Sequence, residues 1–77
     1  MPRVKKLTDE EQYEADELRR IYGSGMLTRL QIGHEIGRGR TATGDWVKDI
    51  PKVLINDIPM YQVSDVARKI VANRVEP

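Results

Sequence analysis

Residues 27–47, which read LTRLQIGHEIGRGRTATGDWV, constrain the fold more than any other part of this chain. Thr28 and Gln31 have the spacing of a capping box, which begins a helix. Gly37 is suited to end that helix in the left-handed conformation, and a second helix is expected over residues 40–49. The sequence therefore predicts two short helices joined by a Gly-Arg-Gly turn, the outline of a helix-turn-helix.

The apolar side chains of this unit predict how the two helices pack. Ile32 and Ile36, at positions i and i+4, give the first helix one buried face. Gly33 costs about 1 kcal/mol relative to Ala in a helix, so we expect another helix to approach closely there. Trp46, the only tryptophan, is expected at the centre of the core. The second helix should divide its side chains between two sides, with Ala42, Trp46 and Val47 inward and Arg40, Thr41 and Thr43 outward.

A further helix is predicted before this unit, over residues 9–22. Thr8 and Glu11 form its capping box, and Gly23 begins the segment that stops it. Two roles are open for this helix: it closes the core over the helix-turn-helix, or it mediates contacts between protomers. Its apolar side chains are few and form a narrow stripe, namely Tyr13, Leu18, Ile21 and Tyr22.

Residues 52–63 change to the period of β-strands. Two short apolar runs flank Asn56 and Asp57, which predicts a hairpin with a tight turn. Pro59 is expected to restrict its strand to an edge or a bulge. Ser64 is expected to cap a last helix over residues 65–73, whose apolar side is Val66, Ala67, Ile70 and Val71.

The predicted fold is mainly α with a small β-hairpin: a winged helix-turn-helix with an additional N-terminal helix. We expect a single winged domain over residues 27–73. The remaining segments are a flexible basic N-terminus (1–8), the N-terminal helix with its linker (9–26) and a frayed C-terminus (74–77).

Composition narrows the class of protein. The 77 residues include no cysteine and one histidine, so no disulfide, thiolate metal site or cofactor is expected. No apolar run approaches the length of a membrane span, and a soluble cytoplasmic protein is expected. Residues 37–42 match a G-x-G-x-x-A pattern, but a dinucleotide site needs a βαβ unit. His34 has no nucleophile or orienting carboxylate arranged with it, and nothing argues for an enzyme.

These elements resemble the small excisionase and MerR-like winged helix-turn-helix proteins of phages and mobile elements. The likeness covers residues 27–72, and the chain departs from the family's pattern at Arg38, Gly39 and the wing tip. It implies a DNA-binding excisionase, recombination directionality factor or small transcriptional regulator, with an integrase or recombinase as a partner and self-association on DNA. The location that the resemblance implies is the cytoplasm of a bacterial cell. The positions that carry it are Leu27-Thr28, Gly33, Ile36-Gly37, Arg40, Trp46-Val47, Pro51, Tyr61 and Ser64-Asp65-Val66.

Net charge is only +1, so any DNA-binding field must be local. Arg40 is the first candidate, because its guanidinium can span guanine O6 and N7. Asp45 and Asp49 would repel phosphate unless they point away. An alternative is a protein-interaction module, or a domain like that of a phage terminase small subunit, that keeps this fold. The wing could touch DNA or be purely structural. The full candidate set for double-stranded DNA is Thr28, Arg38, Arg40, Thr41, Thr43, Lys48, Lys52 and Gln62, with Arg3, Lys5 and Lys6 of the basic tail as additional phosphate contacts.

Overall fold

The computed structural model describes residues 6–74, so Arg3 and Lys5 of the basic tail and the last three positions lie outside the described residues. The prediction of a mainly helical chain with a small hairpin is confirmed, and a short strand before the second helix was not predicted. Within the described range the elements are α1 (Asp9–Tyr22), β1 (Met26–Thr28), α2 (Arg29–Ile36), α3 (Arg40–Trp46), β2 (Lys52–Ile55), β3 (Ile58–Gln62) and α4 (Val63–Ala72).

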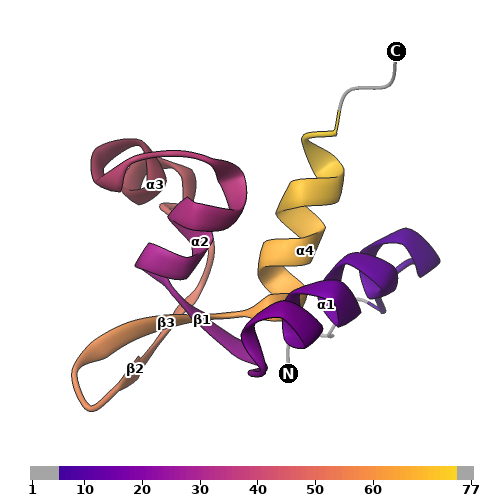
Figure 1. Ribbon diagram of the computed structural model, residues 1–77, viewed down its shortest axis with the longest axis horizontal. Coiled ribbons are helices and arrows are strands. Elements are labelled where there is room, and N and C mark those ends of the chain that lie inside the picture. Colours follow the sequence, from indigo (N-terminus) through magenta and orange to yellow (C-terminus); the bar gives the residue numbers. More distant parts are fainter. Residues whose placement is uncertain (1–5, 75–77) are drawn as a thin grey trace.

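The helices form two pairs that the sheet connects. Figure 1 shows α1 packed beside α4, and α2 beside α3 on the other side of the molecule, while the β2–β3 hairpin extends beyond the helices. Between the pairs lies one core. Its buried apolar side chains are Ala15, Leu18, Leu27, Ile32, Val47, Ile50, Tyr61, Val63, Val66 and Ala67.

Trp46 is not at the centre of this core, as the sequence had led us to expect. It is half-buried and packs against the core from one side. The large apolar side chains of the core with no exposed surface are Leu18, Leu27, Ile32 and Val66. Helix α3 ends at Trp46 rather than at Asp49, and Lys69 of α4 holds the Trp46 carbonyl there, at the rim of the core.

The sheet is antiparallel, with strand order β1-β3-β2. The predicted hairpin is confirmed, and Asn56 and Asp57 both have positive φ (52° and 65°), as a type I′ turn requires. The expectation that Pro59 would restrict its strand to an edge or a bulge is wrong, because β3 is central and pairs with β2 in unbroken register. Pro59 is tolerated because β1 ends at Thr28, opposite Met60, which leaves that side of β3 unpaired at Pro59.

Helix α1 begins and ends as predicted. Its capping box is complete, and Gly23 closes it in the left-handed region. Its buried side differs from the predicted stripe: Ala15 and Leu18 are buried, whereas Tyr13 is 68% exposed. Tyr22 ties the end of α1 to α2, because its hydroxyl donates to Glu35 Oε1 at 3.0 Å. Burial, followed by this hydrogen bond, raises the pKa of Tyr22.

Both ends of α4 differ from the predictions. The helix begins at Val63, one residue before the predicted cap Ser64, and no side chain caps it. The Val63 N–H instead donates to the Gly25 carbonyl at 3.0 Å, so the chain leading into β1 satisfies it. At the other end, Arg74, expected in the frayed C-terminus, forms ion pairs with Glu10 (3.4 Å) and Glu14 (2.8 Å) of α1.

The close approach predicted at Gly33 is made by Thr43 of α3. A Cβ atom on Gly33 would lie 2.8 Å from Thr43 Oγ1 and 3.0 Å from the Arg38 carbonyl oxygen. Thr43 is itself buried, and its hydroxyl donates to the Gly39 carbonyl at 2.8 Å. The prediction that Thr43 faces outward is therefore wrong, as is the prediction that Ala42 faces inward, since Ala42 is exposed. This hydrogen bond to a carbonyl four residues earlier satisfies the buried hydroxyl, so a polar side chain is tolerated at the contact between the helices.

We expect Gly33→Ala to lower the free energy of unfolding by about 1–2 kcal/mol, because overpacking outweighs the gain in helix propensity. Urea unfolding followed by circular dichroism measures the change. Thr43→Ala removes the nearest atom, so the double variant should lose less stability than the two single variants summed. Gly25→Ala is the control, since a Cβ there meets nothing within 4 Å. Strict additivity of the two changes would contradict this account of the contact.

Candidate nucleic-acid interface

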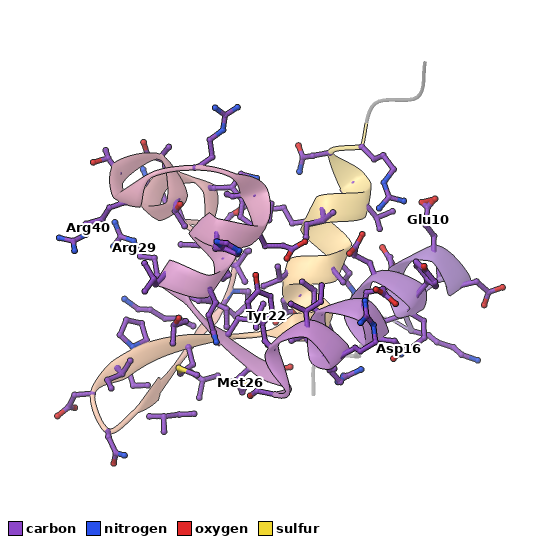
Figure 2. The ribbon with its side chains drawn as sticks, in the orientation of Figure 1. Glu10, Asp16, Tyr22, Met26, Arg29 and Arg40 are labelled. Atoms are coloured by element: carbon purple, nitrogen blue, oxygen red, sulfur yellow. The ribbon has the colours of Figure 1, made fainter. Side chains whose placement is uncertain are left out.

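An open groove lies over α2, the turn after it and the start of α3. Residues from both helices border it, and we call it the α2–α3 groove. Three arginines line it together with one histidine and one leucine: Arg29, Arg38, Arg40, His34 and Leu30. Figure 2 shows Arg29 and Arg40 projecting on the same side of the molecule, far from Glu10 and Asp16 on α1.

Arg29, the first residue of α2, was not among the predicted site residues. Its Nη2 donates to the Arg40 carbonyl at 2.9 Å, which holds the guanidinium against α3. Gly44 makes room for it, because a Cβ on Gly44 would lie 2.9 Å from Arg29 Cζ. The sequence carried one signal: Gly44, like Gly33, is a glycine inside a predicted helix, where a close neighbour is expected.

The arginines of the groove differ from the others in one respect. Within residues 6–74, Arg29, Arg38 and Arg40 form no ion pair with a carboxylate. The remaining arginines of that range do: Arg19 with Asp16, Arg20 with Glu17, Arg68 with Asp65, and Arg74 with Glu10 and Glu14. Three guanidinium groups therefore lie together on the exposed groove, and no carboxylate of the described residues forms an ion pair with them.

The other predicted contacts are spread more widely. Thr28 is half-buried, and its hydroxyl accepts from the Gln31 N–H as the cap of α2. Thr43 lines the groove but is only 1% exposed. Four residues are exposed but do not line the α2–α3 groove: Thr41 on α3, Lys48 after it, Lys52 at the start of β2 and Gln62 at the end of β3.

Acidic side chains are segregated from the groove. Residues 9–17 carry six carboxylates and no basic residue, and this part of α1 packs on α4, away from α2 and α3. On α3, Asp45 remains exposed. Asp49, which the sequence also predicted as a source of repulsion, is neutralised by Lys69, whose Nζ lies 2.6 Å from Asp49 Oδ1. The six carboxylates of α1 and the three arginines of the groove therefore lie on different parts of the molecule.

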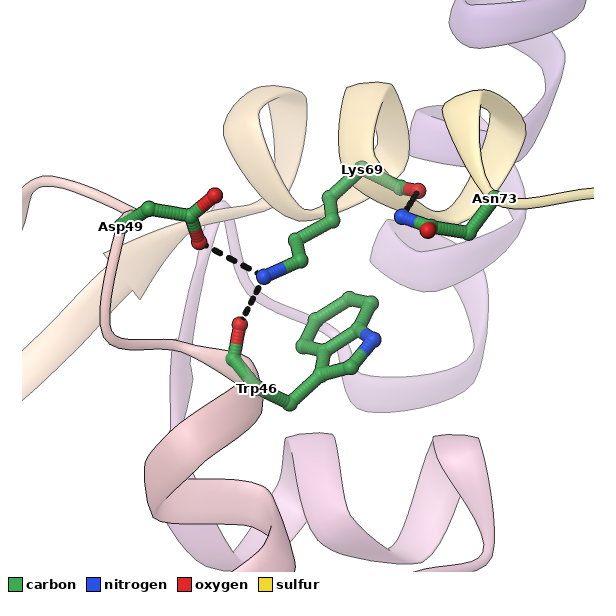
Figure 3. A network of polar contacts seen from close by, with 4 residues as sticks. All are labelled: Trp46, Asp49, Lys69 and Asn73. Carbon is green, nitrogen blue, oxygen red and sulfur yellow. Dashed lines mark hydrogen bonds and ion pairs between the residues drawn. The ribbon is translucent and has the colours of Figure 1, made fainter.

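Lys69 also anchors the end of α3. Figure 3 shows its ammonium group between Asp49 and the Trp46 carbonyl, donating a hydrogen bond to each. The same group lies 4.8 Å from the centre of the Trp46 ring, within the range of a cation–π interaction. The hydrogen bond from Lys69 lowers the pKa of Asp49. One side chain of α4 thereby holds both the last residue of the short α3 helix and the turn that follows it.

No family model, curated protein or solved structure matches this chain. Among the helices of residues 6–74, none is long and apolar enough to cross a membrane. The same residues contain no group of three metal-ligating side chains.

The lowered pKa of Asp49 predicts a pH-dependent contribution to stability. A carboxylate with a depressed folded-state pKa stabilises the fold fully above its unfolded-state pKa. That contribution is lost as the pH falls through the folded-state value. Asp49→Asn should therefore be less stable than the wild type at neutral pH, and the difference should vanish in acid. Thermal unfolding between about pH 7 and pH 2 measures it. Asp45→Asn, which removes an exposed carboxylate of α3 without an ion-pair partner in the described chain, should show no such convergence.

Proposed function

We propose that this chain is a winged helix-turn-helix protein that binds double-stranded DNA through the α2–α3 groove. The observation that carries the proposal is the gathering there of Arg29, Arg38 and Arg40 without carboxylate partners. Neutralising DNA phosphates with cationic side chains releases counterions, which favours binding. A cation that already pairs with a carboxylate of the protein would contribute less of this favourable free energy.

Different roles follow from where the arginines sit. Arg40 is the first residue of α3, and the N-terminal residues of a recognition helix meet base edges in the major groove. We assign Arg40 to a guanine, whose O6 and N7 its guanidinium can span. Arg29 and Arg38 flank it and are assigned to phosphates. Thr41 and Lys48, exposed on and after α3, extend this phosphate-binding surface.

The biological role proposed follows from the resemblance of residues 27–72 to excisionases and MerR-like proteins. The chain would act as a phage or mobile-element excisionase, a recombination directionality factor or a small transcriptional regulator. In the first two roles several protomers bend DNA for an integrase or recombinase. The proposed contribution of this chain is architectural, since bending needs many phosphate contacts and few base contacts.

A second candidate function is protein recognition by the same groove. Leu30 lies among the arginines and is 85% exposed, so the groove offers both cations and an apolar contact to an acidic peptide with an apolar side chain. A terminase small-subunit role would retain DNA binding and differ only in its partners. Titration with random duplex at low and moderate salt separates DNA binding from protein recognition. Affinity weaker than the nonspecific range of roughly 10⁻⁴ to 10⁻⁶ M would remove the DNA-binding proposal.

For Arg40→Ala we expect affinity for a selected DNA site to fall on the order of 10-fold or more, and discrimination at one base pair to relax. Fluorescence anisotropy with the selected site and its single-base variants measures both effects. Arg19→Ala is the matched control, because it removes an exposed arginine that α1 already pairs with Asp16. Equal losses in the two variants would mean that Arg40 acts only through net charge.

Gly44→Ala tests the placement of Arg29 without changing any charge. The new Cβ displaces the Arg29 guanidinium from α3, while alanine favours the helix by about 1 kcal/mol. DNA affinity should fall although the free energy of unfolding does not. In the background of Arg29→Ala the same substitution should leave affinity unchanged. A loss of affinity that persists without Arg29 would show that Gly44 itself must approach the DNA.

A further inference from the structure

The β2–β3 hairpin carries a second exposed surface, which the proposed function leaves unused. Its tip is Asn56-Asp57, with no cation to contact a phosphate. Exposed large apolar side chains concentrate on it: of seven in residues 6–74, four belong to the hairpin, namely Val53, Leu54, Ile55 and Ile58. All four residues of β2 are exposed. A surface of this composition fits a protein partner rather than DNA.

Strand β2 also offers unpaired backbone groups. It lies at the edge of the sheet, because β3 alone pairs with it in the described chain. Ile55 and Ile58 close the type I′ turn, so they form a hydrogen-bonded pair. Hydrogen-bonded and non-hydrogen-bonded pairs alternate along antiparallel strands. The N–H and C=O groups of Lys52 and Leu54 therefore point away from β3, toward the free edge.

We propose that two copies of this chain pair through β2, antiparallel about a two-fold axis at Leu54, to form a continuous six-stranded sheet. In such a pair, the N–H and C=O groups that point to the free edge of one β2 strand must bond those of the other. A two-fold axis at Leu54 meets this condition, because it places Leu54 opposite Leu54 of the second copy. Val53 then lies opposite Ile55 of that copy, as a β-branched apolar pair. Leu54 is 61% exposed in the single chain, and this pairing buries it.

Charge complementarity favours the second copy as the occupant. β2 has a positive residue at its start, Lys52, and the turn beyond its end carries a negative one, Asp57. Antiparallel self-pairing brings Lys52 of each copy beside Asn56 and next to Asp57 of the other, so the attraction acts twice. A lysine often protects an edge strand from pairing. Here it stands at the end of the strand and meets an opposite charge.

The proposal is independent of DNA binding, and its test contains no DNA. Sedimentation of the full chain from low micromolar to millimolar concentration should show a monomer–dimer equilibrium. Leu54→Lys places two lysines against each other at the two-fold axis and should weaken self-association by roughly tenfold or more. Ile21→Lys is the control, because Ile21 is also exposed but lies on α1. A monomer at every concentration, or equal effects of the two variants, would overturn the proposal.

Single cysteines test the register, since the chain has none of its own. Residues of a hydrogen-bonded pair have Cα atoms about 5.5 Å apart, within the range of a disulfide. Leu54→Cys should thus give a disulfide-linked dimer on mild oxidation. Lys52→Cys should not, because its two copies would lie four residues out of register, about 13 Å apart. Cross-linking of Lys52→Cys in preference to Leu54→Cys would reject the register and with it the proposed interface. Urea unfolding of each variant checks that the monomer fold is intact.

Discussion

The contact between Gly33 and Thr43 fixes the relation of α2 to α3, and the candidate site depends on it. With no Cβ on Gly33, the two helices approach until the Thr43 side chain meets the α2 backbone. A second contact runs the opposite way, because Gly44 of α3 accommodates Arg29 of α2. Each helix thus has one glycine that receives a side chain from the other. The Gly33–Thr43 contact holds a seven-residue helix that would be unstable alone, and the Arg29–Gly44 contact places the Arg29 guanidinium against α3.

Helices α1 and α4 stabilise the α2–α3 pair through two polar contacts. Lys69 of α4 donates a hydrogen bond to the Trp46 carbonyl at the end of α3, and Tyr22 of α1 donates one to Glu35 of α2. Both contacts are polar and run from the α1–α4 pair to the α2–α3 pair. Carboxylates of α1 pair with Arg19 and Arg20 of α1 and with Arg74, which follows α4, and not with the arginines of the groove. The same arrangement therefore orients α3 and keeps its exposed side cationic.

Local signals in the sequence predicted the local structure. Both capping boxes, the left-handed Gly37 and the Asn56-Asp57 turn are confirmed because each depends on residues within four positions. The predictions that failed concern residues whose positions depend on contacts distant in the sequence. Thr43 is buried because Gly33, which has no Cβ, leaves space for its side chain. The position of the Arg29 guanidinium depends in the same way on Gly44. Neither contact follows from hydrophobic periodicity. Trp46 was misplaced because Lys69, 23 residues away, holds it at the rim of the core. Strand β1 is three residues long, too short to show a period.

The two proposed surfaces would reinforce each other. Three arginines release few counterions, so one copy alone would hold DNA weakly. Two copies joined through β2 carry two such surfaces related by a two-fold axis, and a DNA site read by both would be an inverted repeat. Once one copy is bound, the second faces its half-site at a high effective concentration. Self-association and DNA binding would then be thermodynamically linked, with DNA that carries both half-sites promoting the dimer and DNA that carries one leaving it unchanged.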